Sequence, residues 1–103
     1  MAVRTVTIWS VQPGRVPEFI ALAAQAKAIH TRLGGSVRLG QISIGGPNTG
    51  QIVYSIEHAD MTAMAKFTDK LNADAEWLKF FGAAQAGGAA TLLSQSLATD
   101  IAI

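Results

Sequence analysis

The chain has 103 residues, of which 50% are hydrophobic and 15% charged, and it carries a net charge of +1 and no cysteine. A chain of this length fits one domain, residues 1–103, with one core. The missing cysteine excludes disulfides, thiolate metal sites and a cysteine nucleophile. The near-neutral charge gives no electrostatic basis for a nucleic-acid or anionic-membrane partner.

The low content of charged residues has a consequence for assembly. A typical globular domain has about 25% charged residues, so this chain has few polar groups to cover its surface. We therefore expect an apolar patch that is buried against a second copy, in a homodimer. No apolar run reaches the roughly 18–20 residues that span a bilayer, and no signal-peptide pattern is present, so we expect a cytoplasmic protein.

The first third of the chain predicts a strand and then a helix. Val3–Val11 has alternating residues and is broken by Gln12-Pro13-Gly14. Pro17 suits the first turn of a helix over Val16–Leu33, whose apolar residues recur at spacings of three and four. Gly34-Gly35 ends this helix by offering left-handed backbone positions.

The middle of the chain predicts a hairpin. The second strand, Ser36–Ile44, changes hydrophobic phase at Gly40-Gln41, which indicates either a bulge or a strand buried on both faces for half its length. Gly45–Gly50 is rich in turn residues. Gln51–His58 then alternates, and its more apolar face should meet the helices; that face holds Ile52, Tyr54, Ile56 and His58.

The last part predicts a helix in two pieces and a final strand. Asp60 can cap a helix over Met61–Leu71, and Asp74 can cap a second piece over Ala75–Ala86. Gly87-Gly88 stops the second piece, and Thr91–Ile103 is the final strand.

The order is β-α-β-β-α-β, which predicts an α+β, ferredoxin-like fold. We expect a four-stranded antiparallel sheet with the first and third strands in the centre and helices on one face. The other face would be bare unless a second copy packs on it. The residues that we predict for this dimer interface are Thr5, Thr7, Trp9, Val53 and Ser55.

Several segments resemble one superfamily. They are Pro13-Gly14-Arg15 before the first helix, Asn48-Thr49-Gly50 in the hairpin, the helix restart Asp74-Ala75-Glu76-Trp77, and the long last strand. With the element order, they resemble the dimeric α/β barrel superfamily, in particular its NIPSNAP-like and antibiotic-biosynthesis-monooxygenase-like groups. The resemblance covers nearly the whole chain and implies sheets paired face to face. It does not transfer an activity, because one fold hosts many functions.

One activity within the superfamily is not expected here. In haem-degrading relatives, a tryptophan at the position that Trp77 matches works with a histidine ligand and an asparagine of the first strand. No histidine follows Trp77, and the first strand has Thr5 and Thr7 instead of asparagine. We expect no cofactor, and the two histidines have no metal-ligand spacing, so we also expect no metal.

Two residues are weak candidates for chemistry. His30 lies on the apolar face of the first helix and is either a base or ligand group in a pocket, or a core histidine bonded to a backbone carbonyl, which we favour. Tyr54 shares the helix-facing side of the third strand, and a Tyr54/His30 pair would suit a carbonyl or phenol. The simpler interpretation of Tyr54 is a core aromatic position, and His58 is interpreted as a solvated or capping residue.

The predicted function follows from these residues. Phe67, Trp77 and Phe80 would form the wall of the core or of a small apolar pocket, which His30 and Tyr54 complete as ligand-binding residues. We therefore expect a homodimeric small-molecule-binding or structural module with an apolar cleft between helices and sheet. The alternative is a cofactor-independent monooxygenase or isomerase that acts on an aromatic or polyketide-like substrate.

Overall fold

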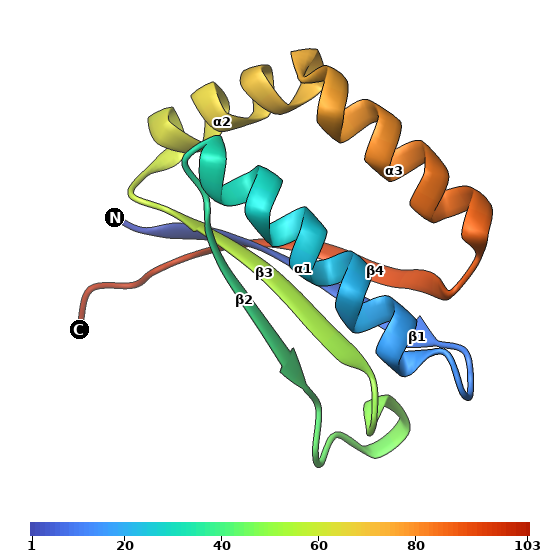
Figure 1. Ribbon diagram of the computed structural model, residues 1–103. Coiled ribbons are helices and arrows are strands. Elements are labelled where there is room, and N and C mark those ends of the chain that lie inside the picture. The colour runs from blue at the N-terminus through green and yellow to red at the C-terminus, as the bar shows by residue number, and fades with distance from the viewer.

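The structure is a computed structural model that describes residues 1–103. Its sheet is antiparallel, with the strand order β2-β3-β1-β4, so β1 and β3 are central as predicted. The ferredoxin-like α+β fold is confirmed (Figure 1). The elements are β1 (Val3–Val11), α1 (Val16–Arg32), β2 (Ser36–Gln41), a 3-10 turn (Gly46–Asn48), β3 (Ile52–His58), α2 (Met61–Ala73), α3 (Ala75–Gly87) and β4 (Ala90–Thr99).

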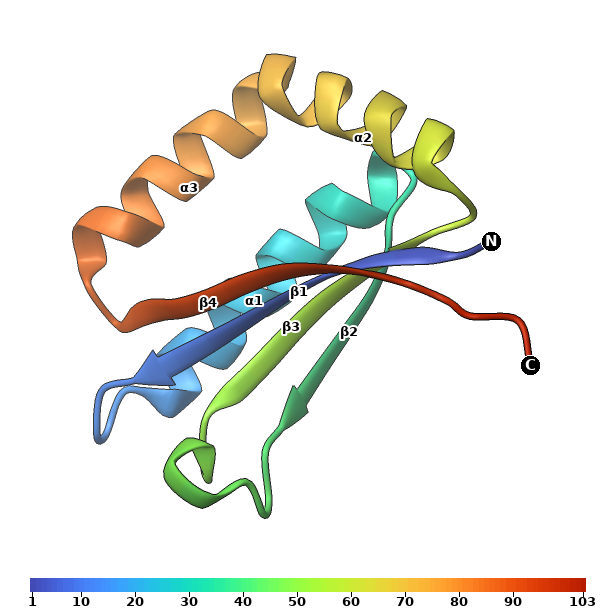
Figure 2. The same ribbon diagram turned by 180° about the vertical axis from the view of Figure 1, so that it is seen from behind.

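All three helices lie on one face of the sheet, and the opposite face carries none (Figures 1 and 2). α1 runs along the sheet, while α2 and α3 meet at an angle and form an arch above it. The two ends of the chain lie close together, since the amide of Asp100 donates to the carbonyl of Ala2. No helix combines the length and the hydropathy that crossing a membrane would require.

The predicted helix boundaries have clear local causes. The carboxylate of Asp60 accepts a hydrogen bond from the amide of Ala63 at 2.8 Å, and that of Asp74 accepts one from Trp77 at 2.9 Å. Both aspartates are therefore N-caps, as predicted. Gly88, with φ of 64°, ends α3 in a left-handed conformation that disfavours side chains.

Three expectations about the strands are wrong. β2 ends at Gln41 and not at Ile44, and its register with β3 is unbroken, so Gly40-Gln41 is not a bulge. The register shift lies instead between β1 and β4, at Ile8/Trp9. β4 ends at Thr99, four residues before the predicted end.

The alternation of β3 is confirmed, because Ile52, Tyr54, Ile56 and His58 are buried and the residues between them are not. The predicted interface is wrong for β1. Thr5, Thr7 and Trp9 pair directly with Ile56, Tyr54 and Ile52, and directly paired residues share a face. They therefore lie under the helices.

We call the helix-free side the open face. Val53 and Ser55 lie on it, as predicted. In β1 they pair with Ile8 and Val6, the residues that alternate with Thr5, Thr7 and Trp9. The open face is thus formed by alternate residues of all four strands: Arg4, Val6, Ile8, Ser36, Arg38, Gly40, Val53, Ser55, Glu57, Ser94, Ser96 and Ala98.

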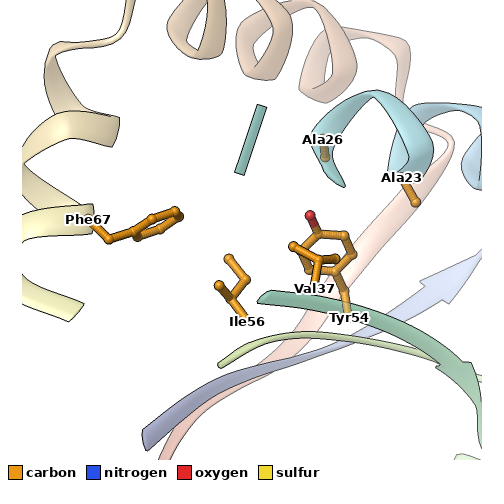
Figure 3. Packing of buried hydrophobic residues seen from close by; sticks show 6 residues of the cluster. All are labelled: Ala23, Ala26, Val37, Tyr54, Ile56 and Phe67. Atoms are coloured by element: carbon orange, nitrogen blue, oxygen red, sulfur yellow. The ribbon is translucent and has the colours of Figure 1, made fainter. Parts of the chain in front are cut away.

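The core is small and lies between α1, α2 and the sheet. Only 14 of the 103 residues are buried, so most apolar side chains keep some exposure. The central cluster is shown in Figure 3, where the hydroxyl of Tyr54 points away from the sheet. Its members are Ala23, Ala26, Val37, Tyr54, Ile56 and Phe67.

Candidate functional site

A cavity of about 670 Å³ lies between the helices and the sheet. It is lined by 25 residues, 17 of them hydrophobic, which come from β1, α1, β3, α2, α3 and β4. This volume falls in the range of typical small-molecule sites, about 300–1,000 Å³. The cavity contains all five predicted ligand-binding residues: His30, Tyr54, Phe67, Trp77 and Phe80.

A buried histidine–tyrosine pair is the principal polar group of the cavity. Nδ1 of His30, on α1, lies 2.6 Å from the hydroxyl of Tyr54, on β3. His30 is 4% exposed and Tyr54 is 9% exposed. The partner of His30 is thus a phenol and not the backbone carbonyl that we favoured. The two side chains approach each other because α1 lies over the sheet and Tyr54 is on the buried face of β3, which points toward the helices.

The second ring nitrogen of His30 has no partner. Nε2 is covered by surrounding side chains and makes no hydrogen bond. Leaving a buried polar atom unmatched costs about 1–3 kcal/mol, so such atoms are rare and each calls for an explanation, such as a bound water or ligand. The pair therefore retains hydrogen-bonding capacity that the protein itself does not use.

Burial keeps both members of the pair neutral. Burial, with a smaller contribution from the nearby His58, lowers the pKa of His30 to about 4. Burial raises the pKa of Tyr54 well above its ordinary value. At neutral pH, a neutral imidazole therefore faces a neutral phenol, and one of them donates the hydrogen bond between them.

Aromatic side chains form the wall beside the pair. The ring of Trp77 lies 4.4 Å from that of His30 and stacks on Phe81 at 5.0 Å, with 17° between the ring planes. Phe67 lies 5.6 Å from His30, and Phe80 lies 5.8 Å from Trp77. Since Trp77 already contacts three rings, it is placed as a wall of the cavity.

His58 contradicts the prediction of a solvated or capping residue. It is 5% exposed, lines the cavity and contacts Phe67 with ring centres 4.7 Å apart. Burial lowers its pKa. Its place on the alternating apolar face of β3 was the signal for burial. The neighbouring carboxylates do not hold it at the surface, because Glu57 pairs with Arg4 and Asp60 caps α2.

Sequence reasoning also missed the floor of the cavity. Nε1 of Trp9 donates to the hydroxyl of Thr7 at 2.9 Å, and that hydroxyl donates to the backbone oxygen of Tyr54 at 3.0 Å. Trp9 also contacts Phe19 of α1, with ring centres 5.8 Å apart. This chain of hydrogen bonds fixes Trp9 beside the backbone of Tyr54. The signal for this position of Trp9 is the antiparallel register of β1 with β3, which pairs Trp9 with the buried Ile52.

The charged side chains gather outside the cavity. Arg32, at the end of α1, pairs with Asp74 and Glu76 at 2.9 and 3.0 Å. Arg15 pairs with Glu18 at 2.7 Å, and donates at 2.8 Å to the carbonyl of Gly87. These contacts hold both ends of α3 to α1 and close the arch above the cavity. No three His, Asp or Glu side chains come together as a metal site would require.

No family model matches the chain, and no curated protein matches it in sequence. Solved structures do match in fold. An uncharacterised NIPSNAP domain protein from Burkholderia xenovorans is 20% identical and has a TM-score of 0.75, over 99% of this chain and 96% of that one.

Two other similar structures carry oxygenase descriptions. SnoaB, a cofactor-independent oxygenase from Streptomyces nogalater, is 20% identical, with a TM-score of 0.69 over 99% of this chain and 95% of that one. A putative antibiotic biosynthesis monooxygenase from Bordetella bronchiseptica is 17% identical, with a TM-score of 0.68 over 98% of both chains. The resemblance inferred from the sequence is confirmed for the fold, and at these identities the likeness establishes the fold alone.

Proposed function

We propose that the chain binds a small, largely apolar ligand in the cavity between its helices and its sheet. The observation that carries the proposal is the cavity of about 670 Å³, lined mainly by apolar and aromatic side chains around the buried His30–Tyr54 pair. Concave apolar sites with a few convergent polar groups are the usual form of ligand pockets. The apolar wall supplies affinity, and the pair orients the ligand.

The state of His30 favours binding over catalysis. A general base works best when its pKa lies near the working pH. The pKa of His30 is lowered to about 4, so its imidazole is a weak base at pH 7. A neutral imidazole remains a good hydrogen-bond partner. The pair is therefore better suited to recognise an oxygen atom than to remove a proton.

Homodimerisation forms part of the proposal. The open face carries Val6, Ile8 and Val53, each partly exposed, beside several serines and the charged side chains of Arg4, Arg38 and Glu57. Only 14 residues are buried in the single chain. A second copy packed against the open face would cover these side chains and would leave the cavity, on the other side of the sheet, free for the ligand.

The binding proposal is tested with the uncharged fluorophore N-phenyl-1-naphthylamine. We expect its fluorescence to rise on titration with the wild-type protein. Ala84 lines the cavity on α3, whereas Ala83 beside it is exposed and does not. Ala84→Trp should weaken binding by at least about tenfold by filling the site. Ala83→Trp is the matched control and should leave binding unchanged. Equal titrations for the two variants would contradict this site.

A second candidate is a cofactor-independent monooxygenase or isomerase that acts on an aromatic or polyketide-like substrate. Two observations favour it: the fold shared with SnoaB, described as a cofactor-independent oxygenase, and the unpartnered Nε2 of His30. In a monooxygenase step, dioxygen and a ring methylene would give a ring carbonyl and one water. His30 and Tyr54 would polarise the substrate oxygen.

This candidate is tested by incubating anthrone, a ring methylene ketone, with the protein in air and under nitrogen. Protein-dependent formation of anthraquinone in air, abolished by His30→Ala, would establish the activity and overturn a purely binding role. Anthraquinone could instead form no faster with the protein than in buffer alone. If that protein still binds the fluorophore, ligand binding remains the proposed function. Phe67 and Phe80 would line the cavity whether the protein only binds its ligand or also oxidises it.

A further inference from the structure

The cavity contains no formal charge. None of its 25 lining residues is Asp, Glu, Lys or Arg. Its titratable groups are His30, His58 and Tyr54, and burial favours the neutral form of each. The arginines Arg15 and Arg32 of the adjoining helix make ion pairs on the protein surface. An ionised ligand would therefore lose its hydration without meeting a counter-ion.

The unused hydrogen-bonding capacity of the pair suits an oxygen atom. When Tyr54 donates to Nδ1 of His30, the proton on Nε2 has no acceptor. When Nδ1 donates to Tyr54 instead, the lone pair of Nε2 and the hydroxyl proton are both unmatched. A ligand hydroxyl that displaces the side chains covering Nε2 can complete either arrangement, and a carbonyl oxygen can complete the first. The aromatic rings around the pair favour a flat ligand.

We propose that the cavity selects its ligand by charge state: it binds the neutral form of a planar aromatic alcohol or ketone and rejects the corresponding anion. This inference rests on the proposed binding function and adds the chemical class of the ligand. The physical reason is that burying an unpaired charge is far more unfavourable than burying a hydroxyl that gains a hydrogen bond. An aromatic carboxylate or a phenolate of the same size should therefore be excluded.

The inference also predicts how pH acts on binding. The titratable groups that face His30 are Tyr54 and His58, both from β3, whereas α2 and α3 contribute Phe67 and Trp77. None of them is charged near pH 7. The affinity for a phenol should therefore follow the ionisation of the phenol itself, and a bound phenol should ionise at a higher pH than the same phenol in water.

The experiment uses three ligands of nearly equal shape, naphthalene, 2-naphthol and 2-naphthoate, in competition with N-phenyl-1-naphthylamine at pH 7. We expect 2-naphthol to bind about 3- to 10-fold more tightly than naphthalene, as one hydrogen bond allows. We expect 2-naphthoate to bind at least about 100-fold more weakly than 2-naphthol, because its charge has no partner. His30→Phe, which removes the unpartnered Nε2, should remove the advantage of 2-naphthol over naphthalene, while Ala83→Trp should preserve it.

A second measurement uses only the wild-type protein, so it does not depend on the folding of a variant. The absorbance of 4-nitrophenol reports its ionisation, and with excess protein the transition should move to higher pH. If 2-naphthoate binds as tightly as 2-naphthol, or if the transition moves to lower pH, charge selection is overturned and the binding cavity stands. If neither the fluorophore nor any of the three ligands binds, the proposed function fails, and charge selection fails with it.

Discussion

Arg32 and Asp74 join the end of α1 to the start of α3. One guanidinium nitrogen of Arg32 lies 2.9 Å from each carboxylate oxygen of Asp74. The same carboxylate caps α3 by accepting from the amide of Trp77. The pKa of Asp74 is lowered, first by the Trp77 amide and then by Arg32. A single carboxylate thus starts α3 and holds the arch over the cavity.

This double role predicts unequal effects for two helix caps. Asp60→Ala removes only the cap of α2, which should destabilise the protein by about 1 kcal/mol. Asp74→Ala removes a cap and the partner of Arg32, so it should lower the melting temperature more than Asp60→Ala does. Thermal unfolding followed by circular dichroism compares the two variants. A smaller effect for Asp74→Ala would show that Arg32 adds nothing to the attachment of α3.

Gly35 is predicted to tolerate a side chain poorly. A Cβ atom there would lie 2.7 Å from Cγ2 of Ile56 and 3.1 Å from a ring carbon of Phe67. Gly35→Ala should therefore destabilise the protein by about 1–3 kcal/mol through overpacking. Gly40 on β2 is the control, because a Cβ atom there meets nothing within 4 Å. Urea unfolding of both variants measures the difference, and equal midpoints would disprove the close packing under Gly35.

Mild acid should destabilise the protein through its histidines. The unfolded chain binds a proton at His30 near pH 6.5, whereas the folded chain resists protonation until about pH 4. The unfolded state therefore binds more protons in this window, and the free energy of unfolding falls as the pH drops from 6.5 toward 4. His58 acts in the same direction, since burial also lowers its pKa. Urea midpoints at pH 7.5 and 5 should differ in the wild type.

The control for this prediction replaces the histidines by a side chain that does not titrate. In His30→Gln the difference between the two midpoints should shrink, and in His30→Gln/His58→Gln it should shrink further. The carboxylates with lowered pKa values, Asp74 and Glu18, ordinarily ionise below pH 5 and so contribute little in this window. If the urea midpoints of the double variant at pH 7.5 and pH 5 differ as much as in the wild type, groups other than these two histidines cause the acid sensitivity.

The two faces of the sheet predict opposite outcomes for two introduced charges. Val53 lies on the open face, so Val53→Asp should convert the proposed dimer to a folded monomer. Thr7 lies on the cavity side and bonds to Trp9 and Tyr54, so Thr7→Asp should destabilise the fold itself. Light scattering gives the mass and circular dichroism the melting temperature. Gln25→Glu, on the exposed side of α1, is the control and should change neither.

A wild-type protein of monomer mass at micromolar concentration would refute the homodimer. In that case the open face would be exposed to solvent in the functional protein, and Val53→Asp would have no effect on the mass. The cavity lies on the other side of the sheet and does not depend on this outcome.

Much of this protein follows from local signals that the sequence carries by itself. Asp60 and Asp74 each precede an apolar periodic run, and each caps a helix because a short carboxylate reaches the first-turn amides. The alternation of β3 identified its buried face, because successive side chains of a strand point to opposite sides. The order of the elements then limited the topology to one common fold.

Only the tertiary structure decided which residues meet. Alternation alone does not say which face of β1 turns toward the helices, and the register with β3 reversed our assignment of Thr5, Thr7 and Trp9. The pairing of His30 with Tyr54, and the burial of His58, depend on where α1 and α2 cross the sheet. Such contacts join segments far apart in the chain, so neither residue of a pair carries a local mark of the other.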